Sequence, residues 1–187
     1  GRFSPIPYVM AGPRIILQIG PHKTVTTYLQ RVFQAMRGTG ILYPAGGPGQ
    51  HGLAAVLATG DADAIARAFD VIARGGRNTV DLAGGKTPAT ESLLLSSEEF
   101  SRLEKDQIAL LAANLHARWG PAPVSVVFYC RRWSALLPSL WQERTRHGQA
   151  QTLPAFLAGV LENPARLSFV QFGLVLDRFA QVFGREA

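Results

Sequence analysis

Apolar and polar positions follow one another along the chain in blocks that predict strands alternating with helices. Residues 14–20 (RIILQIG) form a short, mostly apolar run that ends in glycine, which is typical of a buried parallel strand. Two further apolar runs, SLLLSS at 92–97 and VSVVFYC at 124–130, have the same character. The extended piece ILYP at 41–44 leads into a glycine-rich loop. We therefore expect three buried strands that belong to one parallel sheet.

Helical periodicity fills the segments between these runs. Apolar side chains recur every three or four residues from Leu29 to Met36, which predicts a helix with one apolar face. Asp61 stands where it can cap a second helix, and Ser96 with Glu99 has the spacing of a capping box for a helix after the second strand. In chain order we expect helices over residues 26–37, 51–57, 62–74, 107–119, 133–147, 153–161 and 169–183.

Strands that alternate with helices, through connections too long for hairpins, predict a three-layer α/β fold in which helices flank a parallel sheet. A chain of 187 residues with 47% hydrophobic side chains can bury one sizeable core, so we expect a single domain over residues 1–187. Three strands make a thin sheet, and a strand after Gly184 would be its natural continuation. We therefore expect the domain to be incomplete at its C-terminus.

Charge and cysteine content narrow the possible partners only in part. The formal net charge of +6 suits nucleic acid, an anionic surface or a small polyanionic ligand alike. The single cysteine, Cys130, excludes an intrachain disulfide and a cysteine-rich zinc site, and its place at the end of an apolar run predicts a core position. No apolar run approaches the roughly 18 residues that a membrane-spanning helix needs. We expect a soluble, cytoplasmic protein.

The loop that follows the first apolar run carries the most distinctive chemistry of the sequence. A loop between a strand and a helix directs several backbone N–H groups, and the positive end of the helix dipole, at one anion. A Walker A loop would need a second glycine directly before its lysine, whereas residues 20–27 (GPHKTVTT) contain only Gly20 and place Lys23 early. The loop thus suits a phosphate or a sulfate, and a nucleotide triphosphatase is disfavoured.

Two segments of the chain resemble the nucleotide-binding elements of the sulfotransferase family. The family's 5′-phosphosulfate loop is a strand followed by Lys-Thr/Ser-Gly-Thr-Thr and a helix, and residues 23–27 (KTVTT) match four of these five positions. Its 3′-phosphate element is a strand that ends in arginine, with a serine eight residues later in the next helix. Arg131 and Ser139 have this spacing. A guanidinium binds planar oxyanions in a bidentate manner, and a serine hydroxyl adds a further donor.

The resemblance, which covers residues 14–184, implies a P-loop-like fold and a reaction. Members of the family transfer a sulfuryl group from 3′-phosphoadenosine 5′-phosphosulfate to a hydroxyl or amine of an acceptor, here a carbohydrate or another small molecule, and no metal is needed. Lys23 would hold the bridging oxygen of the donor. By resemblance, the residues that bind the donor are Gly20, Pro21, His22, Lys23, Thr24, Val25, Thr26 and Thr27 at the 5′ side, with Arg131 and Ser139 at the 3′ side.

The sequence departs from the family at Val25, where the family has glycine. Glycine adopts positive φ and lets a ligand approach the backbone, and a β-branched residue does neither cheaply. An inactive sulfotransferase-like protein is therefore one alternative. An active enzyme also needs a general base near Lys23 to take the proton of the acceptor, and the candidates are His51, Glu98 and His22.

Two other classes of protein stay open. A small-molecule kinase with a degenerate phosphate loop would need a carboxylate to hold Mg²⁺, and only Glu98 stands near a strand end. A basic polyanion-binding module would fit the net charge, but the arginines are scattered and do not alternate with aromatic residues. We therefore expect no nucleic acid partner. The sequence does not indicate the oligomeric state.

Overall fold

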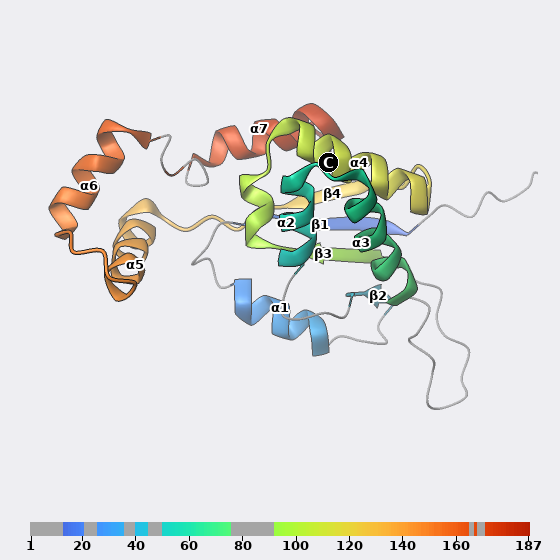
Figure 1. Cartoon of the computed structure of the whole chain (residues 1–187), viewed down its shortest axis with the longest axis horizontal. Coiled ribbons are helices and arrows are strands. Elements are labelled where there is room, and N and C mark those ends of the chain that lie inside the picture. Colours follow the sequence, from blue (N-terminus) through green and yellow to red (C-terminus); the bar gives the residue numbers. More distant parts are fainter. Residues whose placement is uncertain are drawn as a thin grey trace, which may run out of the picture.

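The computed structural model of the chain describes residues 13–20, 26–35, 40–44, 50–75, 92–164, 167 and 171–187. In this part of the chain four parallel strands form one sheet in the order β2-β3-β1-β4. The strands are β1 (Arg14–Gln18), β2 (Ile41–Leu42), β3 (Ser92–Ser96) and β4 (Val124–Val127). Helices flank the sheet (Figure 1), so the expected α/β fold is confirmed, and the extended piece at 41–44 contributes a fourth strand.

The helices lie close to the positions that periodicity predicts. They are α1 (Thr26–Ala35), α2 (His51–Thr59), α3 (Ala62–Gly75), the 3₁₀ helix η1 (Glu98–Arg102), α4 (Lys105–Trp119), α5 (Trp133–Arg146), α6 (Leu153–Glu162) and α7 (Phe172–Phe183). The cap predicted at Ser96 is wrong by one residue. Ser97 caps η1 by accepting a hydrogen bond from the Glu99 N–H at 3.2 Å, whereas Ser96 still belongs to β3.

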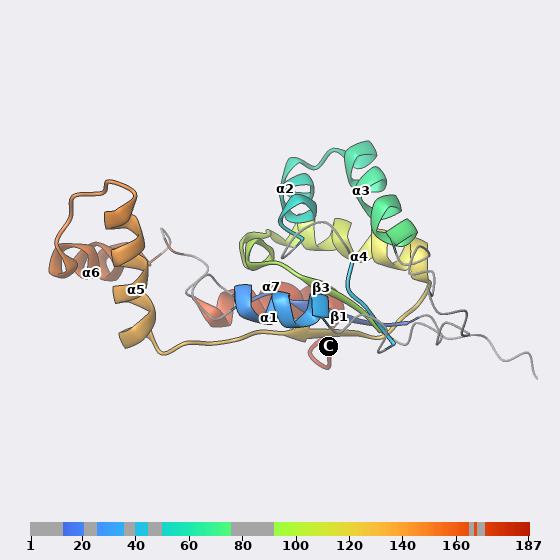
Figure 2. The same ribbon diagram turned by 90° about the horizontal axis from the view of Figure 1, so that it is seen from below.

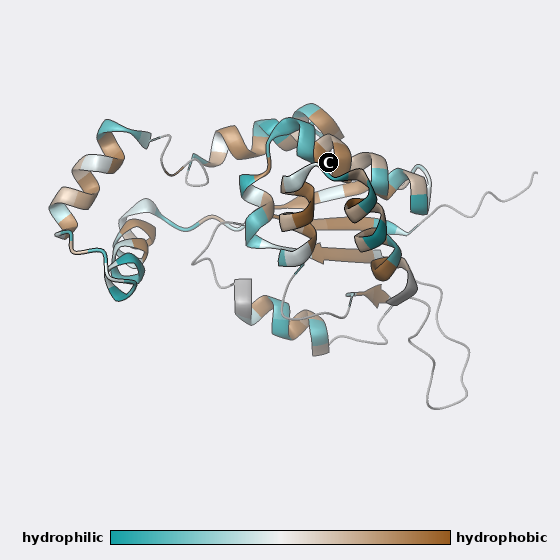
Figure 3. Cartoon of the chain, in the orientation of Figure 1, coloured by the Kyte–Doolittle hydropathy of each residue, from teal (hydrophilic) through white to brown (hydrophobic). Residues whose placement is uncertain are grey.

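The main apolar core lies between the sheet and the helices α2, α3, α4 and α7. Alternate residues of each strand point to it, among them Leu17 and Leu95, which are fully buried. Figure 2 shows α2 and α3 on one side of the strands, well separated from α1, and Figure 3 shows that β1 and β3 are largely apolar. Within the described ranges, no helix combines the length and apolar character needed to cross a membrane.

Helices α5 and α6 form a second, smaller apolar cluster with the start of α7. Its buried members are Leu136, Leu140, Phe156 and Leu167. Trp141 packs partly buried against them, and its indole N–H donates to the Gln151 carbonyl at 2.6 Å. In Figure 1, α5 and α6 lie beyond the carboxyl ends of β1, β3 and β4.

The third predicted strand is shorter than its apolar run. β4 stops at Val127, which is paired with Gln18, the last residue of β1. Beyond Val127 the chain has no residue of β1 opposite it and therefore does not continue as a strand. The chain then runs without regular structure to α5. Cys130 lies in this connecting segment and is exposed, and its predicted core position is therefore wrong.

The cap of α3 offers a direct test of the local structure. The Asp61 carboxylate accepts hydrogen bonds from the N–H groups of Asp63 and Ala64, each at 3.0 Å. Asp61→Ala should lower the free energy of unfolding by about 1 kcal/mol, because both donors lose this partner. Urea unfolding followed by circular dichroism measures the loss. Asp61→Asn keeps a capping oxygen and should retain most of the stability; an equal loss in both variants would contradict the capping role.

Candidate functional site

Three segments leave the sheet side by side at the carboxyl ends of its parallel strands. Hydrogen bonds continue just past the strand ends: the Ser97 N–H donates to the Gln18 carbonyl at 3.1 Å, and the Ile19 N–H donates to the Val127 carbonyl at 3.0 Å. Ligands of α/β proteins bind at this edge, because the loops that follow adjacent strands converge there. We call this edge of β1, β3 and β4 the carboxyl edge.

The expected donor loop begins and ends at this edge. Gly20, two residues after β1, is buried, and Thr26 and Thr27 form the first turn of α1. That turn contains no acidic residue, so nothing in it opposes an anion at the positive end of the helix. Five residues of the predicted loop lie outside the described residues, namely Pro21, His22, Lys23, Thr24 and Val25.

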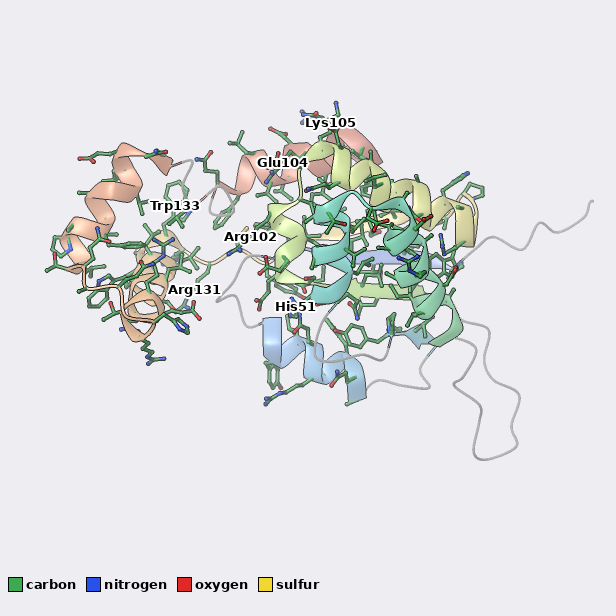
Figure 4. The ribbon with its side chains drawn as sticks, viewed as in Figure 1. His51, Arg102, Glu104, Lys105, Arg131 and Trp133 are labelled. Carbon is green, nitrogen blue, oxygen red and sulfur yellow. The ribbon has the colours of Figure 1, made fainter. Side chains whose placement is uncertain are left out.

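The two residues of the expected 3′-phosphate element occupy different surroundings. Arg131 is exposed in the segment between β4 and α5, four residues beyond the end of β4 rather than at the strand end itself. Ser139 is half-buried in the second turn of α5. Figure 4 shows Arg131 near the start of α5 and apart from His51, so the structure does not bring the side chains of Arg131 and His51 together.

A buried polar network lies beneath the carboxyl edge. The Ser96 hydroxyl donates to the Gln18 side-chain oxygen at 2.5 Å and accepts from the Gln30 side-chain amide at 3.2 Å. Ser96 is fully buried, and Gln18 and Gln30 are each 1% exposed. Strands β1 and β3 and helix α1 are therefore joined by polar side chains. Within the described residues, Nε2 of Gln18 is a buried donor without a partner.

Gln50 extends this network to the start of α2. Its backbone N–H donates to the Ser96 carbonyl at 2.8 Å, and its side-chain oxygen accepts from the Ser96 N–H at 2.5 Å. Because β2 is only two residues long, Gln50 supplies the hydrogen bonds that a longer β2 would give to the end of β3. Burial raises the pKa of the nearby Tyr43, and smaller effects of hydrogen bonds to Ser96 and Gln50 oppose this rise.

Two of the candidate bases stand at the carboxyl edge. His51, a half-buried residue, begins α2, and its Nδ1 lies 3.2 Å from the Ser97 hydroxyl. Glu98, also half-buried, follows Ser97 as the first residue of η1. The third candidate, His22, lies outside the described residues. In the described part of the chain, no group of three or more His, Cys, Asp and Glu side chains is placed to hold a metal ion.

Sequence reasoning missed the glutamines of the network. The periodicity of residues 29–36 indicates a helix with one apolar face and gives no sign of Gln30, which is 1% exposed in α1. The sequence did contain a signal for this network: a glutamine, Gln18, lies in an otherwise apolar strand, and a serine, Ser96, lies near the end of the next apolar run. These two residues are partners in the register of β1 and β3.

Comparison with known proteins gives no match to this chain, whether to a protein-family model, to a curated protein or to a solved structure.

Proposed function

We propose that the protein is a sulfotransferase that moves a sulfuryl group from 3′-phosphoadenosine 5′-phosphosulfate to a hydroxyl or amine of a carbohydrate or another small acceptor. One observation carries the proposal beyond the sequence motifs. β1 and β4 are hydrogen-bonded neighbours as far as the pair Gln18 and Val127. The loop that contains Lys23 and the segment that contains Arg131 therefore start from adjacent positions on one edge, which suits a nucleotide with a phosphate at each end of its ribose.

In the proposed reaction the acceptor oxygen or nitrogen forms a bond to sulfur while the bond between sulfur and the bridging oxygen breaks. The proton of the acceptor passes to a general base, and the departing product is 3′,5′-bisphosphoadenosine. Lys23 stabilises the negative charge that builds on the bridging oxygen. Positioning and charge stabilisation supply the rate enhancement, as they do in phosphoryl transfer.

The binding of the product nucleotide tests the proposed donor site directly. We expect the purified chain to bind 3′,5′-bisphosphoadenosine in isothermal titration calorimetry, and Arg131→Ala to weaken this binding about 10- to 100-fold, because a charge-assisted contact to the 3′-phosphate is lost. Adenosine 5′-phosphate, which lacks the 3′-phosphate, should bind wild type and Arg131→Ala with similar affinity.

The neighbouring Arg132 provides the matched control, since it is also exposed in the segment before α5. Arg132→Ala should bind the bisphosphate nearly as well as wild type. An equal loss in both variants would point to the general positive charge of this segment instead of a 3′-phosphate contact. Absence of binding by the folded wild-type chain would rule out the proposed donor site.

A further inference from the structure

The Ser97 hydroxyl is fully buried between two hydrogen-bond partners. Its oxygen accepts from the Glu99 N–H at 3.2 Å, and it lies 3.2 Å from Nδ1 of His51. A serine hydroxyl has one hydrogen to donate and two lone pairs to accept with. Of these two partners, only Nδ1 of His51 is able to accept the Ser97 hydrogen, because the Glu99 N–H is itself a donor.

This arrangement distinguishes the two neutral forms of the His51 ring. With the proton on Nδ1, the N–H groups of His51 and Glu99 would both point at the Ser97 oxygen and would leave its buried hydrogen without a partner, which is costly. With the proton on Nε2, Nδ1 accepts the Ser97 hydrogen, and the Ser97 oxygen still accepts from the Glu99 N–H, so the buried hydroxyl is fully paired. The geometry thus favours an Nε2–H ring.

We propose that His51 acts at the carboxyl edge as a hydrogen-bond donor, through Nε2–H to an oxygen of a tetrahedral oxyanion, and not as the general base. This inference rests on the proposed sulfotransferase function. A general base would need a bare Nε2, because Nδ1 is already occupied by Ser97. Nε2 is the ring nitrogen that Ser97 does not contact, and His51 is only half-buried.

Hydrogen bonds hold His51 at the ends of β1 and β3. Ser97 donates its N–H to the Gln18 carbonyl, and Gln50, the residue before His51, is joined to Ser96 through both its backbone and its side chain. Figure 4 shows His51 at this end of the sheet. Ser97 is a positioning residue that sets the ring's tautomer. Glu98, the next residue, is then the described candidate for the base.

The tautomer can be measured without any nucleotide. Long-range ¹H–¹⁵N spectra of the full chain, recorded in alkaline buffer, should show the Nε2–H form for His51. Ser97→Ala should lower the fraction of the Nε2–H form toward that of a histidine exposed to water, and Ser97→Thr, which keeps the hydroxyl, should retain the wild-type fraction. An Nδ1–H ring in the wild-type chain would overturn the proposal.

Two variants test whether the Nε2–H of His51 acts as a hydrogen-bond donor, because each replaces the ring with an amide N–H at a different place. His51→Gln places its amide near the position of Nε2, and His51→Asn places it near Nδ1. With 3′-phosphoadenosine 5′-phosphosulfate, we expect His51→Gln to keep turnover within about fivefold of wild type, and His51→Asn and His51→Ala to lose about 100-fold, as for one donor to a developing oxyanion. Equal inactivation of all three variants would indicate a base and overturn the proposal.

Titration with 3′,5′-bisphosphoadenosine identifies the oxyanion. Weaker binding by His51→Asn than by His51→Gln would place the donor on a phosphate, and equal binding with unequal turnover would place it on the sulfuryl group. A wild-type chain that binds no nucleotide would count against the proposed function, while the tautomer measurement would still decide the state of His51.

Discussion

Lys23→Ala is expected to lower the turnover of sulfuryl transfer by about 100- to 1,000-fold. The ammonium of Lys23 is proposed to stabilise charge that appears on the bridging oxygen only as the bond to sulfur breaks. Its loss should therefore lower kcat, and it should also weaken the binding of 3′,5′-bisphosphoadenosine, in which that oxygen carries its full charge. Turnover with a radiolabelled donor and calorimetric titration with the product separate the two effects.

Lys105 is the matched control among the three lysines of the chain, Lys23, Lys86 and Lys105. It is the exposed first residue of α4, and Figure 4 shows it far from His51 at the carboxyl edge. Lys105→Ala should leave turnover unchanged. A similar loss in both variants would mean that total charge matters and not a contact to the donor. Unchanged turnover in Lys23→Ala would remove the lysine from the reaction.

Ser96→Ala should lower the free energy of unfolding by about 2–4 kcal/mol. The substitution removes a hydroxyl that is both donor and acceptor in the buried network, so the Gln18 oxygen and the Gln30 amide each lose a partner while shielded from water. Urea unfolding with linear extrapolation measures the difference.

Ser101→Ala is the control for Ser96→Ala, because it also removes a buried hydroxyl but one that lies outside the network. Ser101 is also fully buried, but within the described part of the chain its hydroxyl makes a single hydrogen bond, to the Glu98 carbonyl at 2.7 Å. Ser101→Ala should cost about 1 kcal/mol. If the two serine variants lose equal stability, the network contributes no more than one ordinary hydrogen bond, and the glutamines must find other partners when Ser96 is absent.

The fold could be predicted because strand and helix periodicities are local properties of the sequence. The apolar runs at 14–20 and 92–97 became β1 and β3, and Asp61 caps α3 as its position indicated. The errors arose where tertiary pairing decides. The run at 124–130 stops being a strand at Val127 because β1 ends opposite it, and this exposes Cys130.

The candidate site was predictable only in part, for a related reason. Motifs place Gly20, Thr26 and Arg131 near strand or helix ends, and these positions depend on short stretches of sequence. The network of Gln18, Ser96 and Gln50 depends instead on which strands are neighbours and on their register, and no local pattern encodes this.

The sheet order has a consequence for the synthesis of the chain. β1 lies between β3 and β4, and its last residue, Gln18, is 78 residues from its partner Ser96. At a translation rate of about 5–20 residues per second, synthesis of the chain from the end of β1 to the end of β3 takes roughly 4–16 seconds, and synthesis as far as β4 takes longer. During that interval both edges of β1 can pair with other chains. The nascent protein is therefore most prone to aggregate before β3 is complete, and a chaperone that shields β1 would protect it at that stage.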